Sequence, residues 1–594
     1  MRLAYSKVSN ILDINKELLL SYHVFIVGNK LPWKWQFKDR FTICQTSFNN
    51  GLDFLVTWET WKNDINRCSH LHYVVLESSS YCKTYLRNIY CNLPTKLLSY
   101  ADSLLCKLPN YYPGIYRLEF EHCNLTLTLF LGVKHVLSKE IVARFNAYFL
   151  SHPTAEEREY FKKIVLNLSK LGAKESTISI IKRDDYILNI LYEIGFKIYI
   201  ENTSVRDLYR IVGVWSRIWS SEYSPLIRNN KKIVIIGAGL SGVGIAHALS
   251  IRGIESNIID IDITGDSHIG HLGASLSPSI SVDNNILSRL VRLGMEQAWS
   301  RWSNLMPKAF LDRCGSLQLD IKFKNDKIFD LINNDSLLSN LYRYVDRIEA
   351  SNIAGIGVSS GGIFCKNSMV VSPRILINRI LKLSKINVIQ QFITKLDKKE
   401  DKWIIFGKDG KQLASADILI LANSYNSLSL LNSIKSQHSL IDLFKARRVL
   451  GEVALIKDID LQGGPNCILE GQCYILPSKN GYCIVGGTYL SDFRNDLLVK
   501  KSRLDNLSNL ADSLNATHNI YHKHISYWHG ERMVLPNRIP MIGNVVDNNN
   551  LFLAIGYASR GLCWSSLGGD IIASQICGEP LLIEKQMMTI LKPR

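Results

Sequence analysis

The chain has 594 residues, of which 46% are hydrophobic and 21% are charged, and its formal net charge is +17. This length exceeds what one hydrophobic core supports, and the composition excludes a disordered or collagen-like chain. No stretch approaches the roughly 20 consecutive apolar residues of a membrane-spanning helix. We therefore expect at least two folded domains and no membrane partner.

The amino-terminal segment and the cysteines both indicate the cytoplasm. In MRLAYSKVSNILDINKELLL, acidic residues and Lys16 precede the short apolar run, unlike the order in a secretory signal. The 13 cysteines include no CxxC pair, and scattered thiols are typical of a reducing compartment. We expect a cytoplasmic protein with neither disulfides nor a metal site, and these features do not predict its oligomeric state.

The positive charge has two explanations. Lys and Arg attract a polyanion such as RNA whatever its sequence. The chain is also rich in Lys, Ile and Asn, as expected when an A/T-biased genome drifts toward their codons, and such drift raises the charge without any function. The charge alone does not separate RNA binding from compositional drift.

The first 220 residues alternate strands and helices. FTIC at residues 41–44, LHYVVLES at 71–78 and STISIIKR at 176–183 read as strands, with helical segments between them. A polar, proline-containing stretch at residues 221–232 separates this region from a second one of the same kind. We predict an α/β protein with domains at residues 1–225 and 230–594.

The second region opens with a dinucleotide-binding pattern. An apolar strand at residues 233–236 leads into a GxGxxG turn at the start of a helix. The first glycine permits a tight turn, the second lets the backbone approach a pyrophosphate, and the third lets helix and strand pack closely. A second strand, at residues 257–259, ends in an acid that can accept hydrogen bonds from a ribose. The predicted dinucleotide site consists of Gly237, Ala238, Gly239, Gly242 and Asp260.

The later part of the chain favours FAD over NAD. A further strand, ADILILAN at residues 416–423, precedes a turn, and a glycine-rich segment near the carboxy terminus leads into a helix. In flavoproteins the carboxy-terminal part of the chain returns to the flavin, whereas a simple dehydrogenase does not need this. The alternative for Gly543, Gly556 and Gly561 is plain turn chemistry.

These residues resemble the D-amino-acid-oxidase class of flavoproteins. The tail also resembles MnmC, the family of bifunctional tRNA 5-methylaminomethyl-2-thiouridine biosynthesis proteins, because Arg532, residues 539–544 and residues 559–562 fill its carboxy-terminal signature. The family joins an amino-terminal methyltransferase domain to a carboxy-terminal FAD domain. The resemblance implies a Rossmann-like methyltransferase-type domain, then an FAD-binding Rossmann-like domain with an inserted antiparallel-sheet substrate subdomain.

The resemblance also implies an activity on tRNA. In the family, the FAD domain converts 5-carboxymethylaminomethyl-2-thiouridine to 5-aminomethyl-2-thiouridine, by hydride transfer to the flavin, imine hydrolysis and flavin reoxidation. The methyltransferase domain then methylates the amine from S-adenosylmethionine. Two alternatives remain open: a free amino-acid or secondary-amine oxidase, and a noncatalytic tRNA-binding protein whose cofactor sites have both decayed.

The methyl-donor loop departs from the family pattern. Ser47 and Asn49 stand where the family has glycines, and Gly51 alone remains of the three. Side chains there fill the space of the donor or require positive φ. Glu77 remains where an acid would hold the ribose hydroxyls, but Ser151 replaces the acid beside the target amine. We favour decay of the methyltransferase over a divergent domain that still binds S-adenosylmethionine.

The flavin half departs less from the family. Three residues after the second strand keep the family identities before the sequence diverges. For the substrate, a guanidinium suits bidentate contact with a carboxylate, and no catalytic base is identified. The candidate flavin contacts are Gly273, Ala274, Ser275, Gly543, Arg560, Gly561 and Leu562. The candidate catalytic residues are Arg532 and Arg538, either of which would hold the substrate carboxylate, and Tyr489, which would face the flavin ring unless it is a core residue of its strand.

Overall fold

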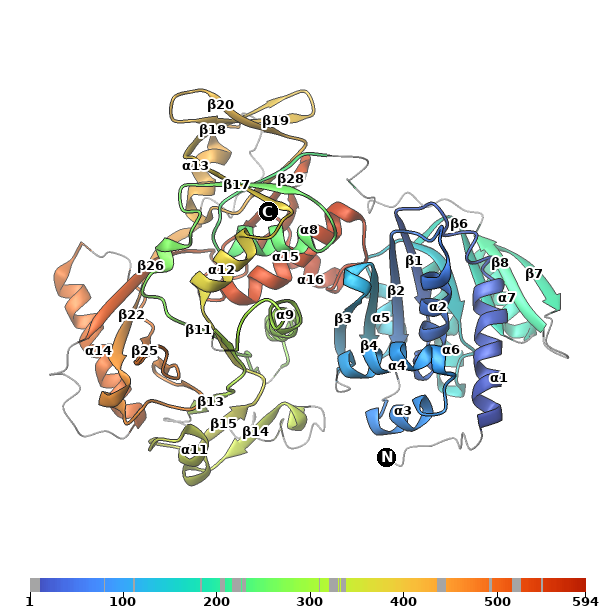
Figure 1. Cartoon of the computed structure of the whole chain (residues 1–594), viewed down its shortest axis with the longest axis horizontal. Coiled ribbons are helices and arrows are strands. Elements are labelled where there is room, and N and C mark those ends of the chain that lie inside the picture. Colours follow the sequence, from blue (N-terminus) through green and yellow to red (C-terminus); the bar gives the residue numbers. More distant parts are fainter. Residues whose placement is uncertain are drawn as a thin grey trace. The chain divides into compact units, whose positions relative to one another are not determined.

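The chain divides into two compact units. In the computed structural model, one unit comprises Met1–Leu226 with Ser574–Gln586, and the other comprises Ile227–Ala573 with Met587–Arg594 (Figure 1). Most of the polar stretch predicted to separate two domains lies outside the described residues, so that boundary stays a prediction. The structure describes residues 11–78, 81–109, 113–181, 184–202, 209–215, 226, 231–281, 283–308, 310–319, 330, 332, 338–434, 445–490, 494–514, 525–545 and 548–594.

Within the described part of the first unit, eight strands form one sheet in the order β3-β4-β2-β1-β5-β6-β8-β7. The run from β4 to β6 is parallel, while β3 and β8 are antiparallel to their neighbours. The predicted strand at residues 41–44 lies in β1, and the other two contribute residues 71–77 to β2 and 176–181 to β6; residues 182–183 lie outside the described part of the chain. The strands are β1 Arg40–Gln45, β2 His70–Glu77, β3 Gly114–Phe120, β4 Leu125–Leu131, β5 Phe145–Leu150, β6 Gly172–Ile181, β7 Phe196–Asn202 and β8 Tyr209–Trp215.

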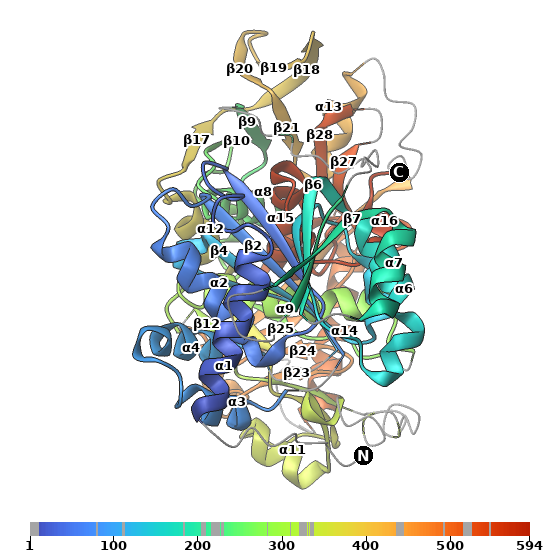
Figure 2. The same cartoon turned by 90° about the vertical axis from the view of Figure 1, so that its right-hand side faces the viewer.

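Helices cover both faces of this sheet, with α1, α2 and α4 on one side and α6 and α7 on the other (Figure 2). Their ends follow local sequence signals: Thr154 and Glu157 form a capping box before α6. Gly195 ends α7 in the left-handed conformation. The helices are α1 Ile11–Ser21, α2 Leu52–Asn63, α3 Lys83–Tyr90, α4 Thr95–Lys107, α5 Lys134–Glu140, α6 Ala155–Ser169 and α7 Asp185–Ile194.

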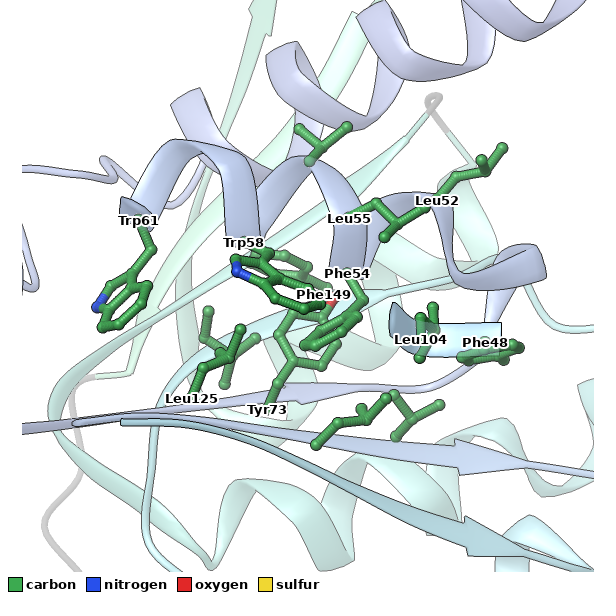
Figure 3. Packing of buried hydrophobic residues seen from close by; sticks show 14 of the residues in the cluster. Phe48, Leu52, Phe54, Leu55, Trp58, Trp61, Tyr73, Leu104, Leu125 and Phe149 are labelled. Atoms are coloured by element: carbon green, nitrogen blue, oxygen red, sulfur yellow. The ribbon is translucent and has the colours of Figure 1, made fainter. Parts of the chain in front are cut away.

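Aromatic rings fill the space between α2 and the sheet (Figure 3). Phe54 of α2 lies edge-on to Tyr73 of β2 with ring centroids 5.3 Å apart, and Tyr73 lies edge-on to Phe149 of β5 at 5.7 Å. Edge-to-face pairs are a preferred aromatic geometry, and full burial of a side chain such as Phe contributes about 2 kcal/mol. This packing fixes α2, and with it the loop that joins β1 to α2.

The segment Ser574–Gln586 packs in the first unit although it comes from the far end of the chain. The buried guanidinium of Arg117, on β3, donates to Ser574 Oγ at 3.0 Å and to the carbonyl oxygen of Pro580. The backbone N–H of Leu581 donates to the Val142 carbonyl at 2.9 Å. The edge of the first unit is therefore completed by residues from near the carboxy terminus.

In the second unit, six of the described strands form a largely parallel sheet in the order β17-β10-β9-β21-β28-β27, with only β27 antiparallel. The predicted strand at residues 233–236 is β9, and the one at 416–423 contains β21. The Rossmann-like α/β fold predicted for this region is confirmed. The strands are β9 Ile233–Ile236, β10 Ser256–Asp260, β17 Ile386–Gln390, β21 Ile418–Leu421, β27 Met541–Val545 and β28 Asn548–Ile555.

A second large sheet of the same unit, counted over its described strands, has the order β14-β15-β13-β23-β24-β25-β22-β26. Its neighbouring strands are antiparallel except β13 and β23. This is the inserted antiparallel sheet that the resemblance implies. Its strands are β13 Ser316–Leu319, β14 Tyr342–Val345, β15 Gly362–Cys365, β22 Arg447–Lys457, β23 Ile468–Glu470, β24 Tyr474–Ile475, β25 Tyr482–Gly486 and β26 Ser526–Val534. Two small sheets hold β11 Ala274–Leu276, β12 Leu311–Asp312 and β16 Met369–Val371, and β18 Ile393–Lys399, β19 Lys402–Gly407 and β20 Gln412–Ala416.

Three helices of the second unit meet at a buried ion cluster. Asp570 of α15 accepts hydrogen bonds from Arg252, just after α8, at 2.8 Å and from Arg301 of α9 at 2.7 Å. Among the described helices, none is both long and apolar enough to cross a membrane. The helices are α8 Leu240–Ser250, α9 Ile286–Trp302, α11 Arg347–Ala354, α12 Pro373–Leu381, α13 Ser427–Asn432, α14 Asp496–Leu514, α15 Gly561–Cys577 and α16 Lys585–Leu591.

We expect the stability of the second unit to fall as the pH drops below about 6.5, the ordinary pKa of histidine. Burial, and then the charges of Arg301 and Arg252, lower the pKa of His247 to about 3. Between these two values only the unfolded chain takes the proton, so the free energy of unfolding decreases by roughly 1 kcal/mol per pH unit. Urea unfolding of the wild type and of His247→Gln at several pH values tests this. The variant should show the smaller pH dependence, and equal slopes would contradict the assignment.

Candidate functional site

The GxGxxG turn joins β9 to α8. Gly237 has φ +113°, and an added Cβ would lie 2.6 Å from the Ala422 carbonyl oxygen. A Cβ on Gly242 would lie 1.8 Å from the Gly237 oxygen, so the fold itself requires both glycines. A Cβ on Gly239 would meet nothing within 4 Å. The backbone at Gly239, at the start of α8, is thus open to close approach, and the turn fits the pyrophosphate of FAD.

Asp260 ends β10 beside this turn. Its Oδ2 accepts from the Ala238 backbone N–H at 2.6 Å, and its Oδ1 accepts from the N–H groups of Ile261 and Asp262 at 2.6 and 3.1 Å. The carboxylate therefore ties the second strand to the glycine turn. A carboxylate has about four acceptor positions, so Asp260 keeps capacity for a ribose hydroxyl.

The amino-terminal end of α15 lies against that of α8, and the two helices run side by side in Figure 1. Ser565 Oγ donates to the Leu240 carbonyl at 2.6 Å, and a Cβ on Gly561 would lie 3.2 Å from Leu240 Cδ1. The start of α15 and the glycine turn are therefore neighbours, although more than 300 residues separate them in the chain. This brings Arg560, Gly561 and Leu562 to the same region as Gly237, Ala238, Gly239, Gly242 and Asp260.

A half-buried carboxylate that the sequence analysis missed lies beside the Gly273–Ser275 segment. Glu470, at the end of β23, accepts hydrogen bonds from the hydroxyls of Ser275, at 3.4 Å, and Ser277. Burial raises the pKa of Glu470, opposed by the two serines and by the charge of Arg560. Glu470 therefore links the two segments predicted to contact the flavin.

Arg532, on β26, lies between two tyrosines. Its guanidinium carbon is 5.5 Å from the centroid of the Tyr489 ring, and its charge opposes the burial that raises the pKa of Tyr474 to about 12. A Cβ on Gly451 would lie 2.5 Å from Arg532 Cζ, so this glycine makes room for the guanidinium. Tyr489 lies beyond the end of β25 and is 62% exposed, so it is not a core strand residue. A guanidinium beside phenol hydroxyls suits a carboxylate.

A stack of rings flanks Arg532. The rings of His271 and Trp528 have centroids 4.1 Å apart with an interplanar angle of 13°, and a Cβ on Gly530 would lie 2.6 Å from the Trp528 ring. Burial, with the charges of His268 and Arg532, lowers the pKa of His271 to about 3 and keeps this imidazole neutral. Over the residues that the structure describes, no group of three or more His, Cys, Asp or Glu side chains is placed to hold a metal ion.

Arg538 and Gly543 lie apart from these clusters. Arg538 is exposed in a turn with φ +57°, where its N–H donates to the Leu535 carbonyl at 3.0 Å. Gly543 pairs with Leu553 in the edge strand β27, which β21 and β28 separate from β9. Of the two candidate arginines, the structure brings Arg532 to the tyrosines.

The β1–α2 loop of the first unit closes on itself. Residues 49–51 take left-handed φ values of 46°, 54° and 77°. Ser47 Oγ and the Phe48 backbone N–H donate to the same oxygen of Glu77, Oε2, at 3.3 and 2.8 Å. Glu77 is buried rather than a solvated strand end. The loop therefore occupies Oε2 of Glu77, an oxygen that would otherwise accept a hydrogen bond from a ribose hydroxyl of the donor.

Asn49, which stands in place of the other glycine, is also held by a hydrogen bond within the first unit. Asn49 Nδ2 donates to Asp53 Oδ2 at 3.1 Å, an oxygen that also accepts from Gln45. The buried Phe48 ring lies 5.6 Å from that of Tyr81, and a Cβ on Gly51 would lie 2.7 Å from the Tyr90 hydroxyl oxygen. Ser151 donates its backbone N–H to Thr46 Oγ at 2.9 Å and offers no carboxylate. These residues fit the closed loop better than they fit S-adenosylmethionine.

Comparison with known proteins assigns the family. The sequence pattern described as "FAD dependent oxidoreductase" matches residues 232–575. The chain belongs to this family. FAD is its cofactor, and the predictions of FAD and of an FAD-dependent oxidoreductase are confirmed.

The match to the FAD dependent oxidoreductase family spans residues 232–575, most of the second unit. Other relatives align with nearly the whole chain, as follows. The "tRNA 5-methylaminomethyl-2-thiouridine biosynthesis bifunctional protein MnmC" of Cupriavidus necator is 27% identical over 616 residues, which are 96% of this chain and 92% of that protein. The protein of the same name from Cupriavidus metallidurans is 27% identical, over 97% of this chain and 91% of its own. The resemblance to MnmC is confirmed. Among solved structures, glycine oxidase from Bacillus cereus ATCC 14579 is 17% identical, with a TM-score of 0.49 over 61% of this chain and 99% of its own.

Proposed function

We propose that this FAD-dependent oxidoreductase modifies the wobble uridine of cytoplasmic tRNA. It converts 5-carboxymethylaminomethyl-2-thiouridine to 5-aminomethyl-2-thiouridine by oxidising a C–N bond. The observation that carries this proposal is the match to proteins named for tRNA thiouridine biosynthesis over 96% of the chain, both units included. A free amino-acid oxidase would need the second unit alone.

The second unit, residues 230–594, is the proposed catalytic domain. When bound, FAD supplies the electron acceptor for the oxidation. The turn between β9 and α8, with Asp260, holds the ADP part, and the starts of β11 and α15 hold the flavin end. The residues assigned to FAD are Gly237, Ala238, Gly239, Gly242, Asp260, Gly273, Ala274, Ser275, Arg560, Gly561 and Leu562.

Arg532 is proposed to bind the carboxylate of the carboxymethyl group. Its guanidinium presents paired donors that match the two carboxylate oxygens. The Tyr474 hydroxyl, whose pKa burial raises to about 12, is protonated at neutral pH and adds a further donor. Holding the carboxylate in this way orients the neighbouring C–N bond. A free amino acid would be held by the same groups, so this cluster does not discriminate between the two substrates.

The first unit, residues 1–225, is proposed to have lost methyl transfer. Three features support this: the Ser47 bond to Glu77, the Asn49 bond to Asp53, and the serine at position 151. Each removes a contact that the donor or the target amine would need. The product of the whole protein is then the aminomethyl nucleoside.

Incubation with tRNA that carries carboxymethylaminomethyl-thiouridine, followed by mass spectrometry of the digested nucleosides, tests the function. We expect aminomethyl-thiouridine both with and without S-adenosylmethionine. Arg532→Gln should lower its yield at a fixed substrate concentration, because the carboxylate loses its partner, while the matched change Arg538→Gln in the exposed turn should not.

Other outcomes would reject parts of the proposal. Methylaminomethyl-thiouridine formed only with the donor would show that the first unit still methylates. Turnover of free glycine derivatives, with tRNA left unchanged, would favour the amine oxidase. Protein that binds tRNA but retains no FAD and converts nothing would favour the noncatalytic alternative.

A further inference from the structure

An exposed aromatic and basic surface lies on the first unit, before β1. Trp33 is 71% exposed and Phe37 is 83% exposed, and Ile65, on the turn that packs against this segment, is 91% exposed. Single exposed apolar side chains are common, but large ones gathered on neighbouring segments mark an interaction site. We call this the Trp33 surface; its residues are Lys30, Trp33, Lys34, Phe37, Lys38, Ile65 and Arg67.

The fold holds this segment rigidly. Trp35 is fully buried, and its Nε1 donates to Asp64 Oδ2 at 2.8 Å. Gln36 Nε2 donates to the same carboxylate, at 3.1 Å to Oδ1. The Phe37 backbone N–H donates to the Asn66 carbonyl at 2.9 Å. Burial of Trp35 thus anchors the turn, while the rings of Trp33 and Phe37 on either side of it stay in solvent.

Phe37 is exposed in a backbone conformation that itself costs free energy. Its φ is +59°, in the left-handed region that bulky residues rarely adopt. Strained residues cluster at binding and catalytic sites, where surrounding contacts hold them in place. The hydrogen bonds of Gln36 and Phe37 to residues 64–66 supply those contacts here.

Positive charges gather on the same surface. Lys30, Lys34 and Lys38 recur at every fourth position; burial, followed by the charges of Lys38 and Lys30, lowers the pKa of Lys34, with Glu175 opposing. The Lys34 ammonium group is held in place by the Glu175 backbone carbonyl, to which its Nζ donates. The Asp64 carboxylate is already engaged by Trp35 and Gln36. The charged residues of the Trp33 surface, Lys30, Lys34, Lys38 and Arg67, are all cations, and the neighbouring carboxylates are Asp39, Asp64 and Glu175.

We infer that the Trp33 surface binds a single-stranded part of RNA, which under the proposed function, on which this inference rests, is a loop or end of tRNA. Unstacked bases lie flat on exposed aromatic rings whatever their sequence, and lysines neutralise the adjoining phosphates. Residues 30–38 of the surface lead into the amino-terminal end of β1, and Ile65 and Arg67 follow the end of α2, whereas the β1–α2 loop follows the carboxy-terminal end of β1. RNA binding here therefore needs no methyl donor, and the first unit keeps a role after methyl transfer is lost.

Binding of an unmodified tRNA and of a short single-stranded oligoribonucleotide to the full-length flavoprotein tests this, by filter binding at several KCl concentrations. Trp33→Ala/Phe37→Ala should weaken binding by about 10-fold with an unchanged salt dependence, because stacking is lost. Lys30→Gln/Lys34→Gln/Lys38→Gln should lower the slope of log K against log salt by about 2. The matched control Lys197→Gln/Tyr199→Ala, on the exposed face of β7, should bind like the wild type.

The same preparations, checked for folding by circular dichroism, are assayed for nucleoside conversion. If the wild type converts tRNA and both surface variants bind like the control, the surface inference fails and the proposed function stands. If the variants lose RNA affinity but the wild type converts no tRNA, the surface stands and the function fails. A wild-type protein that binds neither the tRNA nor the oligoribonucleotide would overturn the inference.

Discussion

Replacing Gly239 with alanine should weaken FAD binding while leaving the fold of the protein intact. Gly239 has φ −72° and ψ −177°, which alanine adopts without strain, and the added Cβ meets no protein atom within 4 Å. The methyl group would instead occupy the space through which the pyrophosphate reaches the backbone. A steric cost of about 1–3 kcal/mol corresponds to an affinity roughly 5- to 150-fold lower.

Flavin absorbance of the purified protein, FAD titration and thermal unfolding measure the two effects separately. Gly357→Ala is the matched control, because its Cβ also meets nothing within 4 Å, and it should change neither. Gly242→Ala should instead impair folding, since its Cβ would lie 1.8 Å from the Gly237 oxygen. Undiminished FAD affinity in Gly239→Ala would contradict the assignment of the turn.

Replacing Asp570 with alanine should destabilise the second unit by about 3–5 kcal/mol, because it leaves buried cations without their carboxylate. Asp570 is fully buried, and the side chains of Arg252 and Arg301 that donate to it are each 5% exposed. These three residues connect the end of α8 with α9 and α15. Loss of the carboxylate therefore affects three helices at once.

Urea unfolding of the FAD-loaded protein measures this change as a shift of the midpoint. Asp409→Ala provides the comparison: its carboxylate, 3.5 Å from Lys411, is largely exposed, and such pairs contribute less than about 1 kcal/mol. Should Asp570→Ala unfold at the wild-type midpoint, the three helices would be held by apolar packing and not by the ion cluster.

The glycine turn was predictable because its signals are local. The strand, the three glycines, the helix and the second acid-tipped strand lie within about 30 successive residues, as a mononucleotide-binding unit requires. Glu470 carried no such signal, because it stands 195 residues from Ser275 in the chain and contacts it only where two different sheets, those of β23 and β11, come together. Trp528 likewise reaches Ser267 across 261 residues of the chain.

Local sequence also could not show whether Arg532 or Arg538 reaches the tyrosines, or which contacts the β1–α2 loop makes. Arg532 falls within β26, whose position beside β22 places the guanidinium next to Gly451, whereas Arg538 falls in the turn beyond that strand. The sequence revealed that Ser47 and Asn49 replace glycines. That their side chains bond Glu77 and Asp53 depends on how β1, β2 and α2 are placed together.

The docking of Ser574–Gln586 in the first unit bears on how such a gene can evolve. Because the segment is encoded after residues 227–573 of the second unit, a gene divided after codon 226 would yield a first product without Ser574 and Pro580, to which Arg117 donates. Arg117 would keep its hydrogen bond to Thr128 but lose those to Ser574 and Pro580. The second product would carry the same segment without the first unit in which Leu581, Leu582 and Ile583 are buried. Fission into two independent genes would thus require compensating changes in both halves, which favours inheritance of the two units as one polypeptide.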